Sequence, residues 1–384
     1  MSSIASEITV FFILILLGFL LKFKFNKPDF KNGLKLYILN IALPATIFIS
    51  IVSVQINSKY LLFPLIALFF NIAIFALTPL ILKISNISDV RKRRTLYMLL
   101  ASFAPGLSCF PIINEFLGYE SLAKASITDF GNKIFVLIFL FFVAFKFHNN
   151  NIKNNNNKNN KPIKTVIKSL FLEPINIVII VAILFISSSS TINDIPLLLI
   201  DLFSKVKDTL APVVLIFIGL SIVFNKHVVK NILPLLFIRS GLCLLLSSAC
   251  MQVTGFTLSE DIKLFLILSL SSVSFWPFLH MTFVDNLEKN IEEGKKTFDT
   301  RYGLNFLAYS LPFSTIIILS LFSNEEILLD FNSIYFISIS FVLFGVFLTM
   351  IFNPFKFKSK EKKILERSNL STDFISNKLG TSQK

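Results

Sequence analysis

The sequence predicts an all-α integral membrane protein with eleven transmembrane helices, ten of which form two inverted repeats of five helices. Three observations lead to this fold class. The 384-residue chain is 54% hydrophobic, and its mean hydropathy of +0.73 is too high for a soluble globule of that length. Connections rich in basic residues alternate along the chain with connections that have few. Its prolines recur at matched intervals in the two halves of the chain.

Eleven apolar runs predict the membrane spans. Runs of roughly 18 or more apolar residues are typical of helices that cross a bilayer, where the backbone must satisfy its own hydrogen bonds. In chain order the runs are Ile8–Leu21, Tyr37–Val54, Tyr60–Leu82, Thr95–Ile113, Ser126–Phe145, Val166–Ile186, Thr209–Phe224, Leu233–Val253, Ile262–Phe283, Gly303–Phe322 and Ser333–Phe352. The first and seventh runs are short, so their ends are approximate.

The chain has a net charge of +14, and its basic residues are concentrated in alternate connections between the runs. When Lys168 and Lys263, at the starts of runs 6 and 9, are counted with the connections before them, 30 of the 37 Lys and Arg residues lie after runs 1, 3, 5, 7 and 9 or in the C-terminal tail, and only five lie in the other connections. Cytoplasmic connections of membrane proteins carry such an excess of basic residues. We therefore expect a multi-pass protein of the cell (plasma or inner) membrane, with its N-terminus outside, its C-terminus in the cytoplasm and no nucleic-acid partner.

The prolines predict a duplication. Three of them recur inside the apolar runs of each half at similar spacing: Pro44, Pro64 and Pro111 at 20 and 47 residues, then Pro212, Pro234 and Pro277 at 22 and 43. Duplicated membrane units with interrupted helices are typical of secondary transporters, and the interruptions point to the binding site. Since five helices is an odd number, the second copy enters the membrane from the opposite side, and the repeats are inverted.

These boundaries divide the chain into five parts. We expect the first five-helix repeat over residues 1–147, a cytoplasmic linker rich in Asn and Lys over 148–165, and the second repeat over 166–322. An additional transmembrane helix over 333–353 has no partner in the duplication, and a basic cytoplasmic tail covers 354–384. The linker lacks apolar periodicity, which favours disorder. The tail is interpreted as a positive anchor, with lipid binding as the alternative.

Several other functions lack their sequence signals. Cys109, Cys243 and Cys250 lie inside apolar runs at no metal-binding spacing, so we interpret them as small apolar fillers. No Walker A phosphate loop is present, and we expect no ATP hydrolysis, no enzymatic activity and no cofactor. Acidic Glu7 precedes the first run and Lys22 follows it, which favours a membrane helix over a signal peptide.

Short motifs occur in a fixed order along the runs. They are LYILNIALPATIFISI at 36–51, APGLSCFPII at 104–113, DFGN at 129–132, EP at 173–174, LAPVVLIFIGLSI at 210–222, WPF at 276–278 and LP at 311–312. Together this set, which spans about Ile8 to Phe322, resembles the auxin efflux carrier family of bacterial permeases and plant auxin exporters. No single motif is specific, whereas their order on the matching runs is typical of that family's fold.

The resemblance implies a ten-helix core in which helices 4 and 9 are broken at prolines and cross near the middle of the membrane. It also implies transport of small organic anions by alternating access. Four positions depart from the family pattern. Ala104 and Cys109 stand where members carry Asn and Gly, and Phe275 and Trp276 are bulkier than the residues usual before the second proline. We therefore expect an altered substrate pocket.

The interruptions in runs 4 and 9 predict the substrate site. A proline inside a helix removes a backbone donor and clashes with the carbonyl one turn back, and such breaks are tolerated in lipid where they line a cavity. Helix N-termini at the breaks present N–H groups and a partial positive charge to an anion. A simple kink without a ligand is the alternative. The predicted substrate-binding residues are Pro105, Gly106, Ser108, Pro111, Asn114, Ser274 and Pro277.

Ionisable residues inside the runs predict coupling to a proton or an ion, because each is costly within a bilayer. Asp129 and Lys133 are four residues apart, so they share a helix face and can pair. We expect Asp129 to take up a proton or cation, with Asn132 adding an oxygen and His280 titrating near neutral pH. A structural ion pair and a hydrogen-bonded core histidine are the alternatives. Arg239 is interpreted as reaching toward the inner face, with attraction of an anion as its alternative.

The leading hypothesis is a secondary active or facilitated transporter for small organic anions. Its partners would be the anion, the lipid bilayer and a proton or sodium ion, with a homodimer left open. A sodium-coupled symporter of the bile-acid type is one alternative, for which Ser271, Ser272 and Ser274 are the hint. A membrane acyltransferase is another, because the spacing of His280 and Asp285 suits a base and its orienter. A non-transporting sensor on the same fold is the last, since the departures could reflect lost transport.

Overall fold

Every regular element in the described part of the chain is a helix, in agreement with the all-α prediction. The computed structural model describes residues 3–25, 28–53, 60, 62–151, 174–188, 192–222, 225–254, 259–323 and 330–352. The predicted tail and the predicted linker from residue 152 onward lie outside these residues. The α-helices are α1 (Ser3–Leu21), α2 (Pro28–Tyr37), α3 (Leu43–Val52), α4 (Leu62–Ile84), α5 (Val90–Leu99), α6 (Pro105–Ser108), α7 (Phe110–Phe116), α8 (Gly118–Ile134), α9 (Leu140–Asn151), α11 (Pro174–Ser187), α12 (Leu197–Asp208), α13 (Leu210–Ser221), α14 (Lys226–Thr254), α15 (Ser259–Ser269), α16 (Trp276–Leu287), α17 (Thr300–Phe322) and α19 (Phe331–Phe352).

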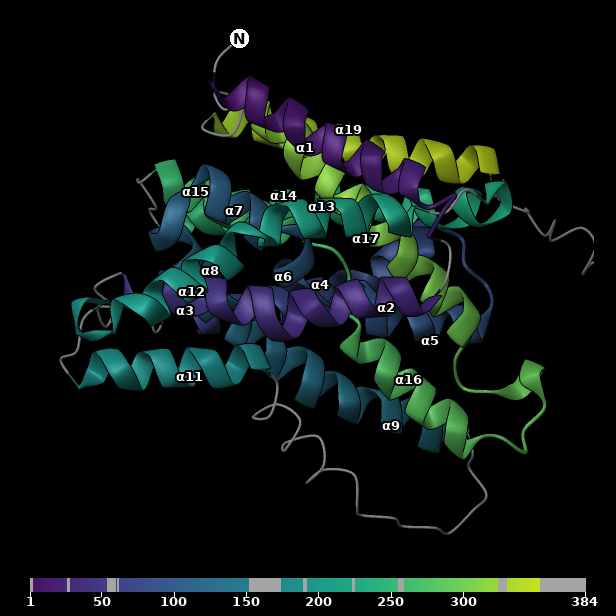
Figure 1. Cartoon of the computed structure of the whole chain (residues 1–384). Helices are drawn as coiled ribbons and strands as arrows, with labels where there is room; N and C mark the ends of the chain where they lie inside the picture. The colour runs from purple at the N-terminus through teal and green to yellow at the C-terminus, as the bar shows by residue number, and fades with distance from the viewer. Residues whose placement is uncertain are drawn as a thin grey trace, which may run out of the picture.

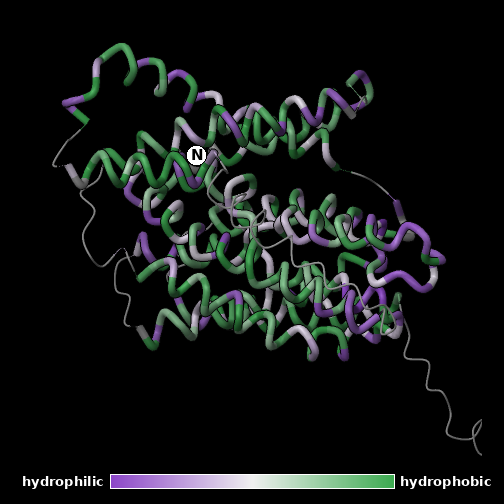
Figure 2. Tube along the Cα trace, turned by 90° about the horizontal axis from the view of Figure 1, so that it is seen from below, coloured by the Kyte–Doolittle hydropathy of each residue, from purple (hydrophilic) through white to green (hydrophobic). Residues whose placement is uncertain are grey.

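The long helices lie in layers with roughly parallel axes, with α1 and α19 on one side of the bundle and α11 and α9 on the opposite side (Figure 1). Within the described residues, six helical stretches are long and apolar enough to cross a membrane: Asp29–Val52, Leu62–Ile84, Gly118–Asn151, Val228–Val253, Thr300–Phe322 and Phe331–Phe352. Figure 2 shows hydrophobic residues along most of each helix and hydrophilic residues mainly at the ends and in the connections. These features fit an all-helical, multi-pass membrane protein.

The other predicted runs are shorter or divided. Apolar helices cover Ile8–Leu21 and Pro174–Ile186, which correspond to runs 1 and 6. Run 7 is preceded by a second helix, so that α12 and α13 follow each other directly. Runs 4 and 9 are not continuous helices. The number of membrane crossings therefore depends on whether these divided elements also span the bilayer.

The interruptions in runs 4 and 9 lie beside prolines. α5 ends at Leu99 and α6 begins at Pro105, with residues 100–104 outside any helix. α15 ends at Ser269 and α16 begins at Trp276, with residues 270–275 outside any helix. Ala104 has φ −135° and ψ 71°, because the residue before a proline avoids the helical region. We call residues 100–104 and 270–275 together the junction.

Two single-turn π-helices are features that the sequence analysis did not anticipate. η1 (Ile38–Ala42) joins α2 to α3, and η3 (Phe135–Phe139) joins α8 to α9. Pro44 is the second residue after η1, and in a regular helix its ring would press on the carbonyl of Asn40. The wider turn relieves that clash and keeps the helix continuous.

Glycines set the closest helix contacts. A Cβ added at Gly18 of α1 would lie 2.2 Å from the carbonyl oxygen of Ile216, and one added at Gly219 of α13 would lie 2.0 Å from that of Ile15. Small residues allow membrane helices to approach this closely. The additional helix α19 packs along α14 in the same way, through Gly345.

Two apolar clusters form the core, and both interruptions run from one cluster to the other. Phe103 belongs to the same cluster as Val273, whereas Cys109 and Leu270 belong to the second cluster. The junction is therefore surrounded by packed apolar side chains. Its backbone polar groups need partners from within the protein.

Candidate functional site

The two helix interruptions meet and are joined by hydrogen bonds. The backbone N–H of Ala104 donates to the carbonyl oxygen of Ser272 at 2.8 Å. The Ser108 hydroxyl accepts from the N–H of Ser272 at 3.0 Å, and the Ser102 hydroxyl accepts from the N–H of Ser274 at 3.3 Å. Each interruption thus satisfies part of the polar backbone that the other exposes.

Arg239 of α14 binds both segments of the junction. Its Nε donates to the carbonyl of Leu100 at 2.9 Å, its Nη2 to that of Ser102 at 3.0 Å and its Nη1 to that of Ser271 at 2.9 Å. The guanidinium also lies 4.4 Å from the centre of the Phe103 ring, within cation–π range. The interpretation of Arg239 as reaching the inner face is wrong. Its planar fork of donors instead supplies partners to carbonyls that lie outside the helices.

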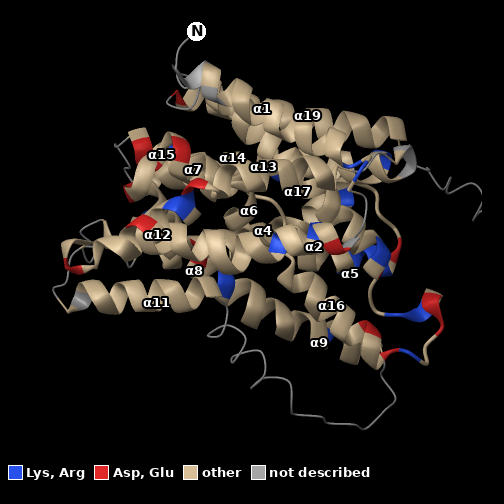
Figure 3. Cartoon of the chain, viewed as in Figure 1, with Lys and Arg blue, Asp and Glu red and all other residues tan. Residues whose placement is uncertain are grey.

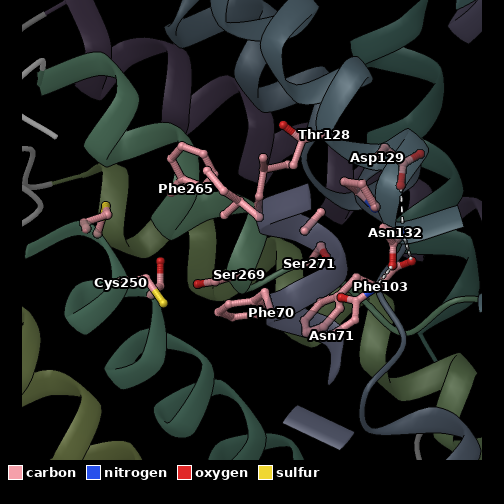
Figure 4. Close-up of a pocket in the computed structure, with 16 residues that line it drawn as sticks. Phe70, Asn71, Phe103, Thr128, Asp129, Asn132, Cys250, Phe265, Ser269 and Ser271 are labelled. Atoms are coloured by element: carbon pink, nitrogen blue, oxygen red, sulfur yellow. Dashed lines mark hydrogen bonds between the residues drawn. The ribbon is translucent and has the colours of Figure 1, made fainter. Parts of the chain in front are cut away.

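A cavity lies beside the junction, lined by residues of α4, α8, α14 and α15 (Figure 4). Most of its lining is apolar, including the rings of Phe70, Phe103 and Phe265. Cys250 and Met251 of α14 line it as well. In Figure 4 the polar groups from α4 and α8 gather on one side, and Phe265 and Cys250 lie toward the other. The carboxylate and the amides are therefore gathered at one end of the cavity, whereas Ser269 lies nearer the other end.

Asn132 connects the carboxylate of the cavity to the junction. Its Nδ2 donates to Asp129 Oδ1 and to the carbonyl of Phe103, both at 2.8 Å. Asn71 of α4 donates to Asn132 Oδ1 at 2.9 Å. Asp129 Oδ2 lies 3.5 Å from Lys133 Nζ, and all four polar side chains are buried. A proton or cation that reached Asp129 would therefore change the pairing of Lys133 and the bonds that Asn132 makes to the junction.

Ser271 offers an unused hydrogen-bonding group in the same cavity. Its side chain is fully buried and lines the cavity, and its hydroxyl has no hydrogen-bond partner among the described residues. A buried polar group without a partner costs roughly 1–3 kcal/mol. The hydroxyl is thus a place where a ligand, an ion or a water molecule can bond.

No protein-family model matches this chain, and no curated protein matches it. Its function is therefore inferred from the geometry of the site and from the sequence motifs. Within the described ranges, no group of three or more His, Cys, Asp or Glu side chains could hold a metal ion. What the site does provide is a carboxylate, two amides and several hydroxyls beside a junction that a buried arginine holds.

The predicted substrate-binding residues are distributed over the junction and the helices next to it. Of the seven, Pro105 lines the cavity. Ser108 and Ser274 instead hold the junction together, as the bonds above show. Pro111 and Pro277 are buried in the first turns of α7 and α16, where a missing N–H breaks no helical bond. Pro277 thus stands in the first turn of the helix that follows the second interruption, whereas Pro111 stands in the first turn of α7, one short helix beyond the first interruption.

Gly106 and Asn114 lie outside the lining of the cavity. A Cβ added at Gly106 would lie 3.3 Å from Leu43 Cδ1 of α3, so this glycine marks where α6 approaches α3. The Oδ1 atom of Asn114 is buried and has no hydrogen-bond partner among the described residues. Asn114 thus shares with Ser271 the property of an unused polar atom, but on α7 rather than in the cavity.

His280 is separate from the network around Asp129. Its Nε2 lies 3.0 Å from the carbonyl oxygen of Val136 in η3, as the alternative of a hydrogen-bonded core histidine expects. Asp285 pairs with Lys296 at 3.0 Å. His280 and Asp285 therefore bond to different partners, and their spacing does not assemble a base with its orienter.

Most residues of the cavity were missed from the sequence, and three of them illustrate why. Asn71 is the lone amide in the run Tyr60–Leu82, and a polar residue inside a span is a signal for an interior position. Phe103 and Phe265 gave no such signal, because they are two of 45 phenylalanines in the chain and resemble the ones that face lipid.

Proposed function

We propose that this chain is a secondary active or facilitated transporter that moves small organic anions by alternating access at the junction. The observation that carries the proposal is the pair of interrupted helices bonded to each other beside a cavity lined by buried polar groups. In secondary transporters, interrupted helices in corresponding positions of two halves mark the binding site. Non-helical backbone at membrane depth is tolerated where it lines a cavity.

The proposal includes two inverted five-helix repeats, with α5–α7 and α15–α16 as the crossing fourth and ninth helices and α19 as an addition. The order of elements supports it. A single helix, a divided helix, a long helix, an interrupted helix and a long helix follow one another from α1 to α9, and the same order returns from α11 to α17. The resemblance of the motifs to the auxin efflux carrier family supports the same arrangement.

Buried charge favours an anionic substrate. Asp129 and Lys133 pair with each other, whereas Arg239 bonds only to backbone carbonyls in the described part of the chain. Together the three groups carry one net positive charge beside the cavity. An organic anion bound there would neutralise this charge, and the low dielectric of the surroundings would strengthen the attraction.

We propose that Asp129, Asn132 and Lys133 couple transport to a proton or a sodium ion. Protonation of Asp129 would release Lys133 and weaken the bond from Asn132, which also holds the carbonyl of Phe103. The oxygens of Asp129 and Ser271 in one cavity favour sodium as the second candidate, because hard cations prefer oxygen ligands. His280 lies outside this network and enters the proposal as a packing residue.

The proposed location is the cell membrane, with the N-terminus outside and the C-terminus in the cytoplasm. Lys and Arg gather mainly toward the end of the bundle where α5 begins (Figure 3). This uneven distribution supports a cytoplasmic position for that end.

Uptake measured in proteoliposomes tests the function. The purified protein is expected to accumulate or release at least one labelled acid from a broad panel, and Asp129→Asn is expected to weaken the response to a proton or sodium gradient. Lys230→Met, an exposed change on α14, is the control and should transport normally. If no acid moves under either gradient, the transporter assignment is wrong. Dependence on sodium alone would favour a symporter of the bile-acid type.

A further inference from the structure

Lys124 of α8 joins two other elements at one end of the cavity. Its Nζ lies 2.8 Å from Asp261 Oδ1 in the first turn of α15 and 2.9 Å from Glu120 Oε1 on its own helix. The Tyr60 hydroxyl donates to the same Glu120 oxygen at 3.3 Å. Lys124 and Asp261 are buried, whereas the Glu120 side chain is 55% exposed. The lysine therefore has one buried partner on a different helix and one exposed partner on its own helix.

This ion pair lies one helical turn beyond the cavity. Thr128, four residues after Lys124, lines the cavity and donates to the carbonyl of Lys124 at 2.6 Å. Phe265, four residues after Asp261, lines it from α15. Residues four apart lie on the same face of a helix. In Figure 3, basic and acidic positions lie together near α7 and α15, at the end of the bundle opposite the start of α5.

A small apolar cluster lies next to both the ion pair and the cavity. It consists of Tyr60, Phe63 and Ile127, with Ile66 and Phe265 packed against it. Ile66 and Phe265 also line the cavity. The apolar cluster thus contacts the lining of the cavity on one side and the Lys124–Asp261 pair on the other.

We propose that the Lys124–Asp261 pair and this apolar cluster form an outer gate that controls aqueous access to the cavity. The gate is closed while the pair joins α8 to α15 and open when the two helices part. Its use in alternating access rests on the proposed function, whereas its effect on access to the cavity does not.

The charges of Lys124, Asp261 and Glu120 suit a contact that opens and closes better than a permanent link between α8 and α15. Breaking a buried ion pair normally leaves an unpaired charge in the interior at high cost. Here Glu120 stays beside Lys124 when α15 moves away, because both lie on α8. Asp261 lies in the first turn of α15, where the partial positive charge of a helix N-terminus stabilises a carboxylate. Both members of the pair therefore keep a favourable partner in the open state.

Cys250 provides a reporter inside the cavity. It lines the cavity from α14, whereas Cys109 and Cys243 are fully buried. Cys250 is partly exposed in the structure, so in intact cells that express the full chain, a charged, membrane-impermeant methanethiosulfonate reagent added outside should modify it at a measurable rate. In Lys124→Ala and in Asp261→Asn the rate should rise roughly tenfold, the factor that follows when about 1.4 kcal/mol favouring the closed state is lost.

Glu120→Gln is the matched control, since it removes a charge from the same cluster but leaves the α8–α15 pair in place. Because Glu120 stabilises Lys124 in the open state, the Cys250 rate of this variant should equal the wild-type rate or be up to about twofold lower, a change of roughly 0.4 kcal/mol. If the rate of Cys250 labelling is unchanged in both gate variants and the protein remains monodisperse, the gate proposal is wrong and the pair is a permanent link between α8 and α15. An equal rise in Glu120→Gln would overturn it too.

The labelling experiment needs no substrate, so the gate and the proposed function can fail separately. Altered labelling in a protein that transports no acid would leave the gate standing and reject the transporter. Transport of an acid with unaltered labelling in the gate variants would reject the gate and keep the transporter.

Discussion

At the scale of single residues, Arg239 determines the conformation of both interruptions. Arg239→Met would leave the carbonyls of Leu100, Ser102 and Ser271 without this donor, and a buried bond to a charged group is worth about 1.5–3 kcal/mol. We expect a clearly lower unfolding temperature in detergent. Lys230→Met on the same helix is the control, because Lys230 is exposed and such surface changes stay within about 0.5 kcal/mol. Equal losses in the two variants would contradict the role of Arg239.

Glu288 is a second residue with a testable contribution. Glu288 lies just after α16, and its side chain is buried. Its Oε1 atom lies 2.7 Å from His148 Nδ1, and its carboxylate accepts hydrogen bonds from the N–H and the hydroxyl of Thr297. Burial alone would raise the pKa of this carboxyl, but the bonds from His148 and Thr297 outweigh burial and hold the pKa below the ordinary 4.5. A depressed pKa contributes stability above the unfolded-state pKa, and that contribution is lost as pH falls through the folded-state pKa.

We therefore expect Glu288→Gln to lower the unfolding temperature at pH 7, and the difference from the wild type to shrink as the pH falls below 4.5. Thermal unfolding measured across this pH range checks the expectation. Glu293→Gln is the control, because the side chain of Glu293 is 80% exposed. A difference that persists unchanged at low pH would contradict the assigned ionic role.

Local spacing predicted some residue contacts and missed others. The pairing of Asp129 with Lys133 is confirmed, because four residues along a helix place two side chains on one face whatever the tertiary structure. Leu100 and Ser102, which Arg239 binds, and Asp261, which pairs with Lys124, each lie more than a hundred residues away in sequence from their partner. No local pattern reveals such partners, and Lys124 was accordingly counted among the charges of a connection.

At the scale of helices, the contact between α1 and α13 depends on glycine. A Cβ added at Gly219 would lie 2.0 Å from the carbonyl oxygen of Ile15 and 2.7 Å from the backbone nitrogen of Phe19. Backbone atoms cannot avoid the added Cβ by a change of rotamer, so Gly219→Ala must displace α1. We expect a loss of about 1–3 kcal/mol, typical of overpacking, seen as a lower unfolding temperature.

Gly33→Ala is the matched control for this substitution. Gly33 lies within α2, and a Cβ added there would meet nothing within 4 Å. Alanine is a better helix former than glycine by up to about 1 kcal/mol. The control should therefore be neutral or stabilising, and a loss of similar size in both variants would contradict the close contact of α1 and α13.

Prolines located the interrupted helices but not the extent of each interruption. Pro105 and Pro277 stand at the beginnings of α6 and α16, as the sequence analysis expected of breaks in runs 4 and 9. The non-helical segments extend several residues before each proline. They are stabilised by groups from elsewhere in the chain, such as Arg239 and the Ser310 hydroxyl, which accepts from the N–H of Val273 at 3.3 Å. These tertiary bonds leave no trace in the local sequence.

At the scale of the whole molecule, hydropathy predicted the helical class and most of the helix positions, because apolar runs in lipid can form only helices or closed barrels. It did not predict which helices touch. The packing of α19 on α14 depends on Gly345 approaching the carbonyl of Pro234 to the point where a Cβ would lie 2.7 Å away. Such a fit is a property of two surfaces rather than of either sequence segment.

The number of membrane crossings decides on which sides the ends of the chain lie. Eleven crossings place the termini on opposite sides, whereas crossings by the six long stretches alone would place them on the same side.

The divided pair α12–α13 provides the most direct local test of the number of crossings. Asp194 precedes α12 and Asn225 follows α13, so a crossing by this pair separates the two residues. We expect an N-terminal tag and Asp194→Cys to react with an impermeant reagent outside intact cells, and a C-terminal tag and Asn225→Cys to react only after permeabilisation. Reaction of both termini from one side would make the eleven-helix prediction wrong, and reaction of Asp194→Cys and Asn225→Cys from one side would show that α12–α13 does not cross.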